Sequence, residues 1–203
     1  LAMNGSQVFD NSAAQDGGGM YVYNADATLR GTHVFSNAAG LDGGGIYLLA
    51  CTMTLSDTQV LSNTAEQDGG GLFVRLGSTT LTKTQISANT ADRWGGGMLM
   101  DRGDATLANG EINENEASRG GGIYVDEGTA AVNGSRVLSN GAKYGGGLYL
   151  YDGHAALTQT QVVGNEALND GGGVFFDQHN ANLTISNGKI KDNAAGASGV
   201  TYA

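Results

Sequence analysis

The chain repeats itself about every 26 residues, and this period constrains its fold more than any other feature. One asparagine marks each repeat, and neighbouring markers are 25 to 28 residues apart. The markers are Asn11, Asn37, Asn63, Asn89, Asn115, Asn140, Asn165 and Asn193. A repeat of this length is typical of an array of stacked units, in which each unit buries its apolar face against its neighbours.

Three columns at fixed offsets from the marker contain only apolar residues in every repeat. Eight residues before the marker lie Met3, Leu29, Leu55, Leu81, Leu107, Val132, Leu157 and Ile185. Three residues before it lie Val8, Val34, Val60, Ile86, Ile112, Val137, Val162 and Ile190. Two residues after it lie Ala13, Ala39, Ala65, Ala91, Ala117, Ala142, Ala167 and Ala195. Side chains alternate along a strand, so two inward columns at an odd spacing require a corner between them.

A glycine run follows each alanine and leads into a third apolar segment. The runs end at Gly19, Gly45, Gly71, Gly97, Gly122, Gly147 and Gly173, and the last repeat keeps only Gly199. In Ile46-Tyr47-Leu48 and its counterparts, alternation predicts two inward residues and a middle residue that points outward. Val200 and Tyr202 are the inward pair of the last repeat. Triple glycine and β-branched residues both oppose helix formation.

The sequence therefore predicts an all-β protein, a right-handed parallel β-helix of about eight coils with three short strands per coil. We expect one domain over residues 1–203, as a fragment of a longer chain. The stacked asparagines should form a hydrogen-bonded ladder along the axis. Glycine permits the positive φ that a sharp corner between sheets requires.

Composition excludes several classes of partner. The net charge of −10 disfavours nucleic acid and anionic membranes. No apolar stretch is long enough to form a transmembrane segment. Cys51 is the single cysteine, so an internal disulfide is excluded.

The repeat resembles those of bacterial polymorphic outer-membrane proteins and of the passenger domains of autotransporter-like adhesins. Val60-Leu61-Ser62-Asn63 is similar to their Phe-x-x-Asn motif, and Gly69-Gly70-Gly71-Leu72 to their Gly-Gly-Ala-Ile motif. The resemblance covers the whole chain. It implies a non-catalytic structural or adhesive protein, extracellular or at the cell surface, that binds carbohydrate, protein or other copies of itself. The fold alone does not decide function, because β-helices serve as lyases, hydrolases, adhesins and stalks.

An aromatic row is the most regular outward feature and the first candidate binding surface. It comprises Tyr21, Tyr47, Phe73, Leu99, Tyr124, Tyr149 and Phe175. Exposed rings at this spacing could stack against sugar rings. The alternative is that they stack on one another, at about 0.5–1.5 kcal/mol per pair.

A second outward row, immediately before the glycine runs, is acidic in its first half. It begins with Asp16, Asp42 and Asp68 and continues with Trp94, Arg119, Tyr144 and Asp170. Stacked carboxylates repel one another, and Ca²⁺ could relieve the repulsion. The alternative is a set of solvated surface aspartates. We expect no other cofactor.

Acidic turns after the third strand offer the best place for catalysis. They contain Asp101, Arg102, Asp104, Asp126, Glu127, Asp152, His154, Asp177 and His179. Paired carboxylates can act as acid and base in a polysaccharide lyase or hydrolase. However, Asp and Gly also favour such turns for backbone reasons, and no long loop builds a cleft. We therefore predict no catalytic residues and a protein that is not an enzyme.

Three weaker features complete the outer surface. A threonine row, Thr28, Thr54, Thr80, Thr106 and Thr184, suits ice binding, but the paired row two residues later is too irregular. Phe9, Phe35 and Leu61 form an apolar patch that could contact a partner. Open ends of the helix predict an alternative role, as an end-to-end self-assembling subunit.

Overall fold

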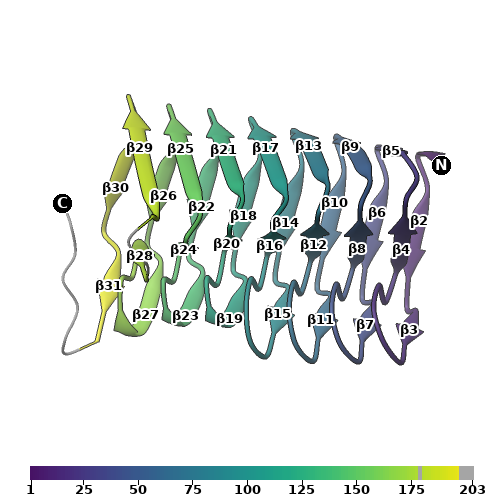
Figure 1. Ribbon diagram of the computed structural model, residues 1–203, viewed down its shortest axis with the longest axis horizontal. Coiled ribbons are helices and arrows are strands. Elements are labelled where there is room, and N and C mark those ends of the chain that lie inside the picture. The colour runs from purple at the N-terminus through teal and green to yellow at the C-terminus, as the bar shows by residue number, and fades with distance from the viewer. Residues whose placement is uncertain (178–179, 197–203) are drawn as a thin grey trace.

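The computed structural model describes residues 1–177 and 180–196 and has the form of a rod of stacked coils (Figure 1). Each coil contributes strands to four parallel sheets, which we call A to D in chain order. Sheets A, B and C each have eight strands, and sheet D has seven in the described part. With a spacing of about 4.8 Å between strands, eight coils span roughly 38 Å.

The strands of each sheet follow one another at intervals of one coil. Sheet A contains β1 (Ala2–Asn4), β5 (Ala27–Arg30), β9 (Thr52–Ser56), β13 (Ser78–Thr82), β17 (Asp104–Ala108), β21 (Thr129–Asn133), β25 (His154–Thr158) and β29 (Asn182–Ser186). Sheet B contains β2 (Gln7–Phe9), β6 (His33–Phe35), β10 (Gln59–Leu61), β14 (Gln85–Ser87), β18 (Glu111–Asn113), β22 (Arg136–Leu138), β26 (Gln161–Val163) and β30 (Lys189–Lys191).

The two remaining sheets complete each turn of the rod. Sheet C contains β3 (Ser12–Ala13), β7 (Ala38–Ala39), β11 (Thr64–Ala65), β15 (Thr90–Ala91), β19 (Glu116–Arg119), β23 (Gly141–Tyr144), β27 (Glu166–Asp170) and β31 (Ala194–Ala195). Sheet D contains β4 (Met20–Tyr23), β8 (Ile46–Leu49), β12 (Leu72–Arg75), β16 (Met98–Asp101), β20 (Ile123–Asp126), β24 (Leu148–Tyr151) and β28 (Val174–Phe176).

The structure has four strands per coil where the sequence predicts three. The additional strand is the short sheet C segment, whose alanine pairs with the alanine of the next coil, as Ala65 does with Ala91. Only two residues pair in each of the first four sheet C strands, which is too short for a visible alternation pattern. The difference therefore follows from strand length and does not alter the predicted stack.

The predicted inward columns form the core. Equivalent residues are register partners from coil to coil, as Leu55 and Leu81 are in sheet A and Val60 and Ile86 in sheet B. All four of these side chains are completely buried. The core positions predicted at Val200 and Tyr202, and the corner at Gly199, lie outside the described residues. Within the described residues no helix is capable of spanning a membrane.

The predicted asparagine ladder is present along the bend between sheets B and C. The Asn63 main-chain N–H and side-chain Nδ2 both donate to Oδ1 of Asn89, at 2.9 Å each. Nδ2 of Asn63 also donates to the Val34 carbonyl at 3.1 Å. The same pattern links all eight asparagines, and each one from Asn11 to Asn165 donates to the Oδ1 of the asparagine in the next coil. The ladder thus satisfies main-chain groups that the bend would otherwise leave buried and unpaired.

The glycine runs allow two stretches of backbone to pass at close range. Gly43 has a φ of +67°, which glycine adopts without steric penalty. At Gly44 a Cβ would lie 2.4 Å from the Thr64 carbonyl oxygen of the next coil. The run therefore lets the chain leave sheet C, reverse, and enter sheet D against its neighbour.

Candidate functional site

The aromatic row is buried, so the prediction that its rings are exposed is wrong for most of the row. Its members Tyr47, Phe73, Leu99, Tyr124 and Tyr149 are no more than 3% exposed. Phe175 is partly buried, and Tyr21 is 50% exposed. The segment between sheets C and D folds back over these side chains: a Cβ on Gly43 would lie 2.7 Å from the Tyr47 Cβ. The rings form a second apolar cluster on the outer side of sheet D.

Stacking between neighbouring rings confirms the alternative interpretation of this row. The Tyr124 and Tyr149 rings are parallel within 10°, with centroids 4.9 Å apart. Trp94 stacks on Tyr124 with centroids 5.4 Å apart and planes 7° apart. Trp94 belongs to the same coil as Leu99, the one described member of the row that is not aromatic. Its indole therefore supplies the ring that this coil lacks within the row.

Trp94 belongs to the loop row, which we define as Asp16, Asp42, Asp68, Trp94, Arg119, Tyr144 and Asp170. In its first half, the Asp16 and Asp42 carboxylates each accept a hydrogen bond from the main chain of the next coil. The Asp42 N–H donates to Asp16 Oδ1 at 3.3 Å, and the Asp68 N–H donates to Asp42 Oδ1 at 3.2 Å. These carboxylates therefore act as structural acceptors.

Asp68 is the most buried acid of the loop row, at 7% exposed. Burial raises its pKa to about 6, with the Asp42 charge adding to the effect and the Arg93 guanidinium opposing it. Burial also raises the pKa of Asp42. Within the described residues Oδ1 of Asp68 has no hydrogen-bond partner. No three His, Cys, Asp or Glu side chains gather there as a metal site, and Ca²⁺ at Asp16, Asp42 and Asp68 stays a prediction.

Arg93 shows how this surface holds a guanidinium group. Its Nη1 lies 2.9 Å from Gln67 Oε1 and 3.7 Å from Asp68 Oδ2. Its Cζ lies 4.3 Å from the centre of the Trp94 ring. The guanidinium is thus surrounded by a ring, a carboxylate and an amide.

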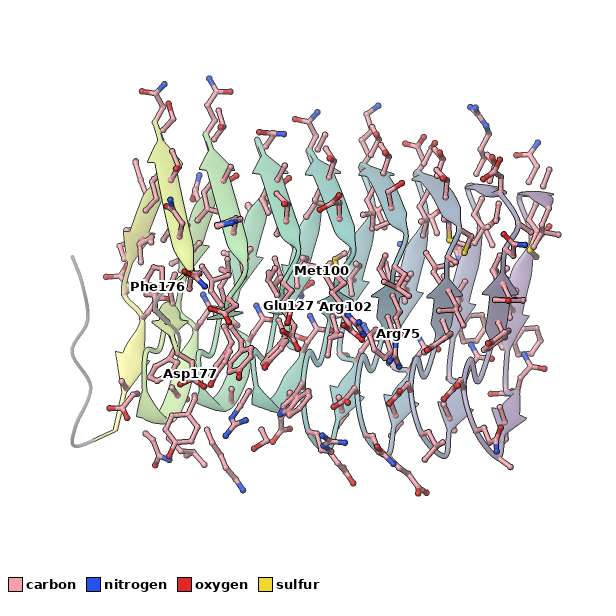
Figure 2. All side chains as sticks on the ribbon, viewed as in Figure 1. Arg75, Met100, Arg102, Glu127, Phe176 and Asp177 are labelled. Atoms are coloured by element: carbon pink, nitrogen blue, oxygen red, sulfur yellow. The ribbon has the colours of Figure 1, made fainter. Side chains whose placement is uncertain are left out.

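Sheet D carries a further outward row, two positions after the aromatic row. This edge row comprises Tyr23, Leu49, Arg75, Asp101, Asp126, Tyr151 and Asp177. Figure 2 shows Arg75, Arg102, Glu127 and Asp177 following one another along the rod. The structure therefore gathers part of the predicted acidic turn cluster along one side of sheet D.

Asp101 and Asp126 are register partners with different surroundings. Asp101 Oδ2 lies 3.1 Å from Arg75 Nε, and its Oδ1 lies 2.9 Å from Arg102 Nε. Burial raises the pKa of Asp126 to about 6, with the charges of Asp101 and Glu127 adding to the effect. Two guanidinium groups thus neutralise one carboxylate, while its neighbour has no ion-pair partner among the described residues.

Asp177 ends the edge row and is anchored by a ring of the aromatic row. The Tyr149 hydroxyl donates to Asp177 Oδ2. Burial and this contact raise the pKa of Tyr149, which keeps the phenol protonated as a donor. Asp104 and His154 instead begin strands of sheet A and are exposed, while His179 lies outside the described residues.

The predicted threonine row and apolar patch lie on sheets A and B. The threonine row points outward from sheet A, with Thr54, Thr80 and Thr106 in register. Phe9 and Phe35 stack with centroids 4.9 Å apart on sheet B, and Phe9 is 45% exposed.

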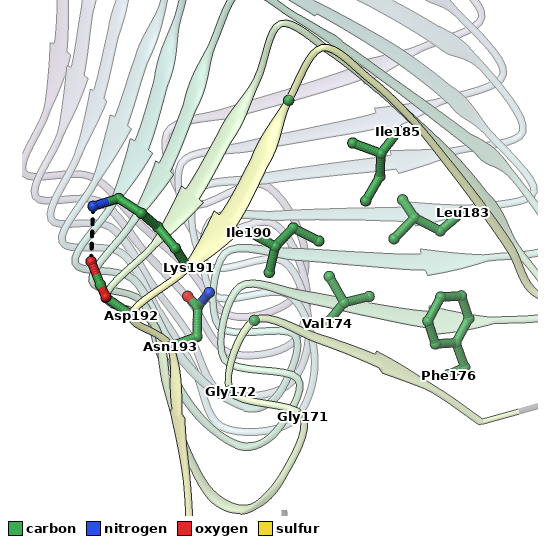
Figure 3. Close-up of a pocket in the computed structure, with 12 residues that line it drawn as sticks. Gly171, Gly172, Val174, Phe176, Leu183, Ile185, Ile190, Lys191, Asp192 and Asn193 are labelled. Atoms are coloured by element: carbon green, nitrogen blue, oxygen red, sulfur yellow. Dashed lines mark ion pairs between the residues drawn. The ribbon is translucent and has the colours of Figure 1, made fainter. Parts of the chain in front are cut away.

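An apolar hollow of about 560 Å³ lies at the last coils (Figure 3). It is lined by Val174, Phe176, Leu183, Ile185 and Ile190. These residues continue the inward columns of the coils, so the hollow is the end of the core and not a separate ligand site. A polar hollow of about 680 Å³ between sheets D and A includes Arg102 and Asp104 in its lining.

The roles of Trp94 and Tyr151, both beside sheet D, were not predicted from the sequence. Trp94 departs from the aspartates that open its row, whereas the edge row of Tyr151 has no usual residue type. Departure from the repeat is therefore the feature that could have identified Trp94, since the repeated residues build the stack.

Comparisons with known proteins agree with this architecture. A family model described as a right-handed β-helix region matches residues 1–190. No curated protein matches the chain. No solved structure matches it either.

Proposed function

The chain belongs to the right-handed β-helix family, and from this premise we propose that it is a non-catalytic rod that binds a partner at a cell surface or outside the cell. The binding surface is the strip formed by the edge row and loop row beside sheet D in coils four to seven. Resemblance to polymorphic outer-membrane proteins and autotransporter passengers supports the surface location and stays a prediction.

One observation carries this proposal: aromatic and charged side chains that depart from the repeat lie together beside sheet D. The inward columns, the asparagines and the glycines are nearly invariant because they build the stack of coils. By contrast, Trp94, Arg119 and Tyr144 replace the aspartates of the loop row, and Asp101, Asp126 and Tyr151 vary along the edge row. Several of these side chains are only partly buried, so a partner can contact them.

The proposal is tested by measuring binding and turnover on the same ligands. Labelled protein is applied to an array of bacterial, plant and animal glycans and to immobilised surface proteins, and reducing ends and unsaturated products are assayed in parallel. We expect retention on at least one ligand class without product. Product release would contradict the non-catalytic role, and absence of retention on every ligand would contradict the binding role.

A polysaccharide hydrolase is the second candidate, and the Asp101–Asp126 pair favours it. A carboxyl whose pKa is raised to about 6 suits a general acid, and the neighbouring carboxylate is held by two arginines. Asp126→Asn should then abolish product release while leaving retention intact. Against this candidate, the turns that follow Asp101 and Asp126 are only two residues long, which leaves little chain to build a cleft around the pair.

A further inference from the structure

The outer face of sheet B carries apolar side chains that belong neither to the core nor to the binding strip beside sheet D. Phe9, Phe35 and Leu61 are register partners in successive coils. Phe9 is 45% exposed, and its ring lies parallel to that of Phe35 with centroids 4.9 Å apart. Leu138 and Val163 are register partners further along the rod and are partly exposed. Apolar side chains repeated along one exposed face indicate contact with another surface.

The polarity of this row is nearly the same when it is read from either end. Sheet B runs the length of the rod (Figure 1), and coils one to eight contribute Phe9, Phe35, Leu61, Ser87, Asn113, Leu138, Val163 and Lys191. The polar pair at the centre, Ser87 and Asn113, has apolar side chains on both sides. Two copies packed antiparallel through this face, about a two-fold axis between coils four and five, would therefore match apolar to apolar and polar to polar.

This arrangement sets each coil against one particular coil of the second copy. The two-fold axis runs along the strands, so each outward row faces itself in reverse order. Coil three faces coil six, and Leu61 of each copy meets Leu138 of the other. In the same way Phe35 meets Val163. An axis moved to coil four would place Leu61 against Asn113, so the match depends on this register.

The second outward row of sheet B fits the same register. It comprises Gln7, His33, Gln59, Gln85, Glu111, Arg136, Gln161 and Lys189. In the antiparallel arrangement Glu111, Arg136 and Lys189 each face a glutamine of the second copy. A parallel arrangement would place Glu111 against Glu111 and Arg136 against Arg136. Like charges directly opposite each other are destabilising, so the charges favour the antiparallel order.

The distribution of charge over the whole rod also favours contact through this side. From the second residue of each sheet A strand to the marker asparagine, the coils carry five acidic and five basic residues. The other fifteen acidic and five basic residues lie on the side of sheets C and D, which therefore carries the whole net charge of −10. Contact through sheet B keeps these acidic sides apart. Asp10 would face Asp192, but Lys191, whose Nζ lies 2.9 Å from Asp192 Oδ2, faces Phe9 and lies beside both carboxylates.

We propose that two copies of the chain associate antiparallel, face to face, through sheet B. The strip beside sheet D stays free in both copies, so this inference is independent of the proposed binding function. Eight coils at about 4.8 Å and three-residue strands at about 3.3 Å per residue give a face of roughly 38 by 10 Å. This area, on the order of 400 Å² per copy, is about half of a standard interface. The dimer is therefore reversible and depends on concentration.

Analytical ultracentrifugation over a hundredfold range of concentration tests the dimer. The mass of the wild type should rise toward twice that of the monomer. Leu61→Lys puts a charge against the leucine of the other copy and should raise the dissociation constant at least tenfold. Leu61→Lys/Leu138→Glu sets opposite charges face to face and should restore it to within about threefold of the wild type. The matched control is Thr54→Lys, in the same coil on sheet A, which should change it less than twofold.

Disulfide cross-linking tests the register. In Leu61→Cys/Leu138→Cys the two positions of one chain are three coils apart, roughly 14 Å, which is too far for an internal disulfide. Oxidation should therefore yield a covalent dimer. Thr54→Cys/Ala131→Cys places cysteines in the same two coils on sheet A and should remain monomeric. Leu61→Cys alone should also remain monomeric, because Leu61 does not face itself, and the native Cys51 is buried.

A wild type that stays monomeric over the whole range of concentration would overturn the proposal. Equal weakening by Leu61→Lys and Thr54→Lys would place the contact on another surface. Cross-linking of Leu61→Cys alone, as complete as that of the double variant, would exclude the antiparallel register. Circular dichroism checks that each variant is folded. If Leu61→Lys does not fold, Phe35→Lys and Phe35→Lys/Val163→Glu repeat the test at the next facing pair.

Discussion

Trp94 lies parallel to Tyr124, with ring centroids 5.4 Å apart, although the two residues occupy different rows of the repeat. Coil four has Leu99 in the aromatic row, and the indole from the loop row restores the continuity of the rings. Trp94→Ala should therefore lower the free energy of unfolding by about 2–3 kcal/mol, less than for a fully buried tryptophan because Trp94 is partly exposed. Urea unfolding measures the change, and Tyr23→Ala, at a ring that is 62% exposed, is the control.

The same pair predicts a compensating double substitution. Trp94→Asp/Leu99→Tyr gives coil four the residues that coils one and two have, with the ring on sheet D and the carboxylate in the loop row. It should be more stable than the sum of the two single substitutions predicts, by about 1 kcal/mol or more. Additive losses would show that the indole does not replace the missing ring.

The asparagine ladder predicts a position-dependent loss of stability. In Asn89→Ala, the two Asn63 donors lose the oxygen that accepts from them, and the Val60 and Asn115 oxygens lose the Nδ2 donor. All of these groups are buried. Buried groups left unpaired cost about 1–3 kcal/mol each, so we expect a loss of at least 3 kcal/mol. Asn11→Ala, at an exposed marker, should cost about 1 kcal/mol or less by the same measurement. Similar losses at both positions would contradict a role for burial.

The crowded glycines predict a contrast between two Gly→Ala substitutions. At Gly44 the new Cβ would lie 2.4 Å from the Thr64 oxygen, and main chain on both sides prevents relief. At Gly141 nothing lies within 4 Å of the added atom. Gly44→Ala should prevent cooperative unfolding or lower stability by more than about 4 kcal/mol, the range of the most severe substitutions. Gly141→Ala should stay within about 0.5 kcal/mol of the wild type in a thermal melt.

The buried Asp68 makes stability depend on pH in an unusual direction. Its pKa of about 6 in the folded state exceeds the ordinary value of about 3.9, so the unfolded chain releases its proton at lower pH. Stability from this group is therefore complete below about pH 4 and is lost as pH rises to about 6, by up to roughly 3 kcal/mol. Urea unfolding at pH 4, 5, 6 and 7 measures this change. The midpoint of Asp68→Asn should rise relative to that of the wild type as the pH increases from 4 to 6. Parallel curves would exclude a raised pKa at Asp68.

The stacking of coils was predictable because Leu55, Val60 and their equivalents report directly which side of the chain is buried. Alternation could not show that Tyr47 is buried as well. It indicates on which face of a sheet a residue lies, and not whether another segment covers that face. The covering segment is built from glycine and polar residues and has no apolar pattern of its own. The pairing of Leu99 with Trp94 within one coil was the available clue, because a ring is lost in one row and gained in another.

The register between coils is regular along most of the rod, with one shift between β23 and β27, so positions on the rod are spaced in steps of one coil. Each strand pairs only with strands one coil away, and each ladder asparagine accepts from one neighbour and donates to the other. Excision of one whole coil, such as residues 38–63, brings together surfaces that already match and shortens the rod by about 4.8 Å. Length can thus change by duplication or loss of single units without redesign of the remainder, and the distance between sites on the rod changes in the same steps.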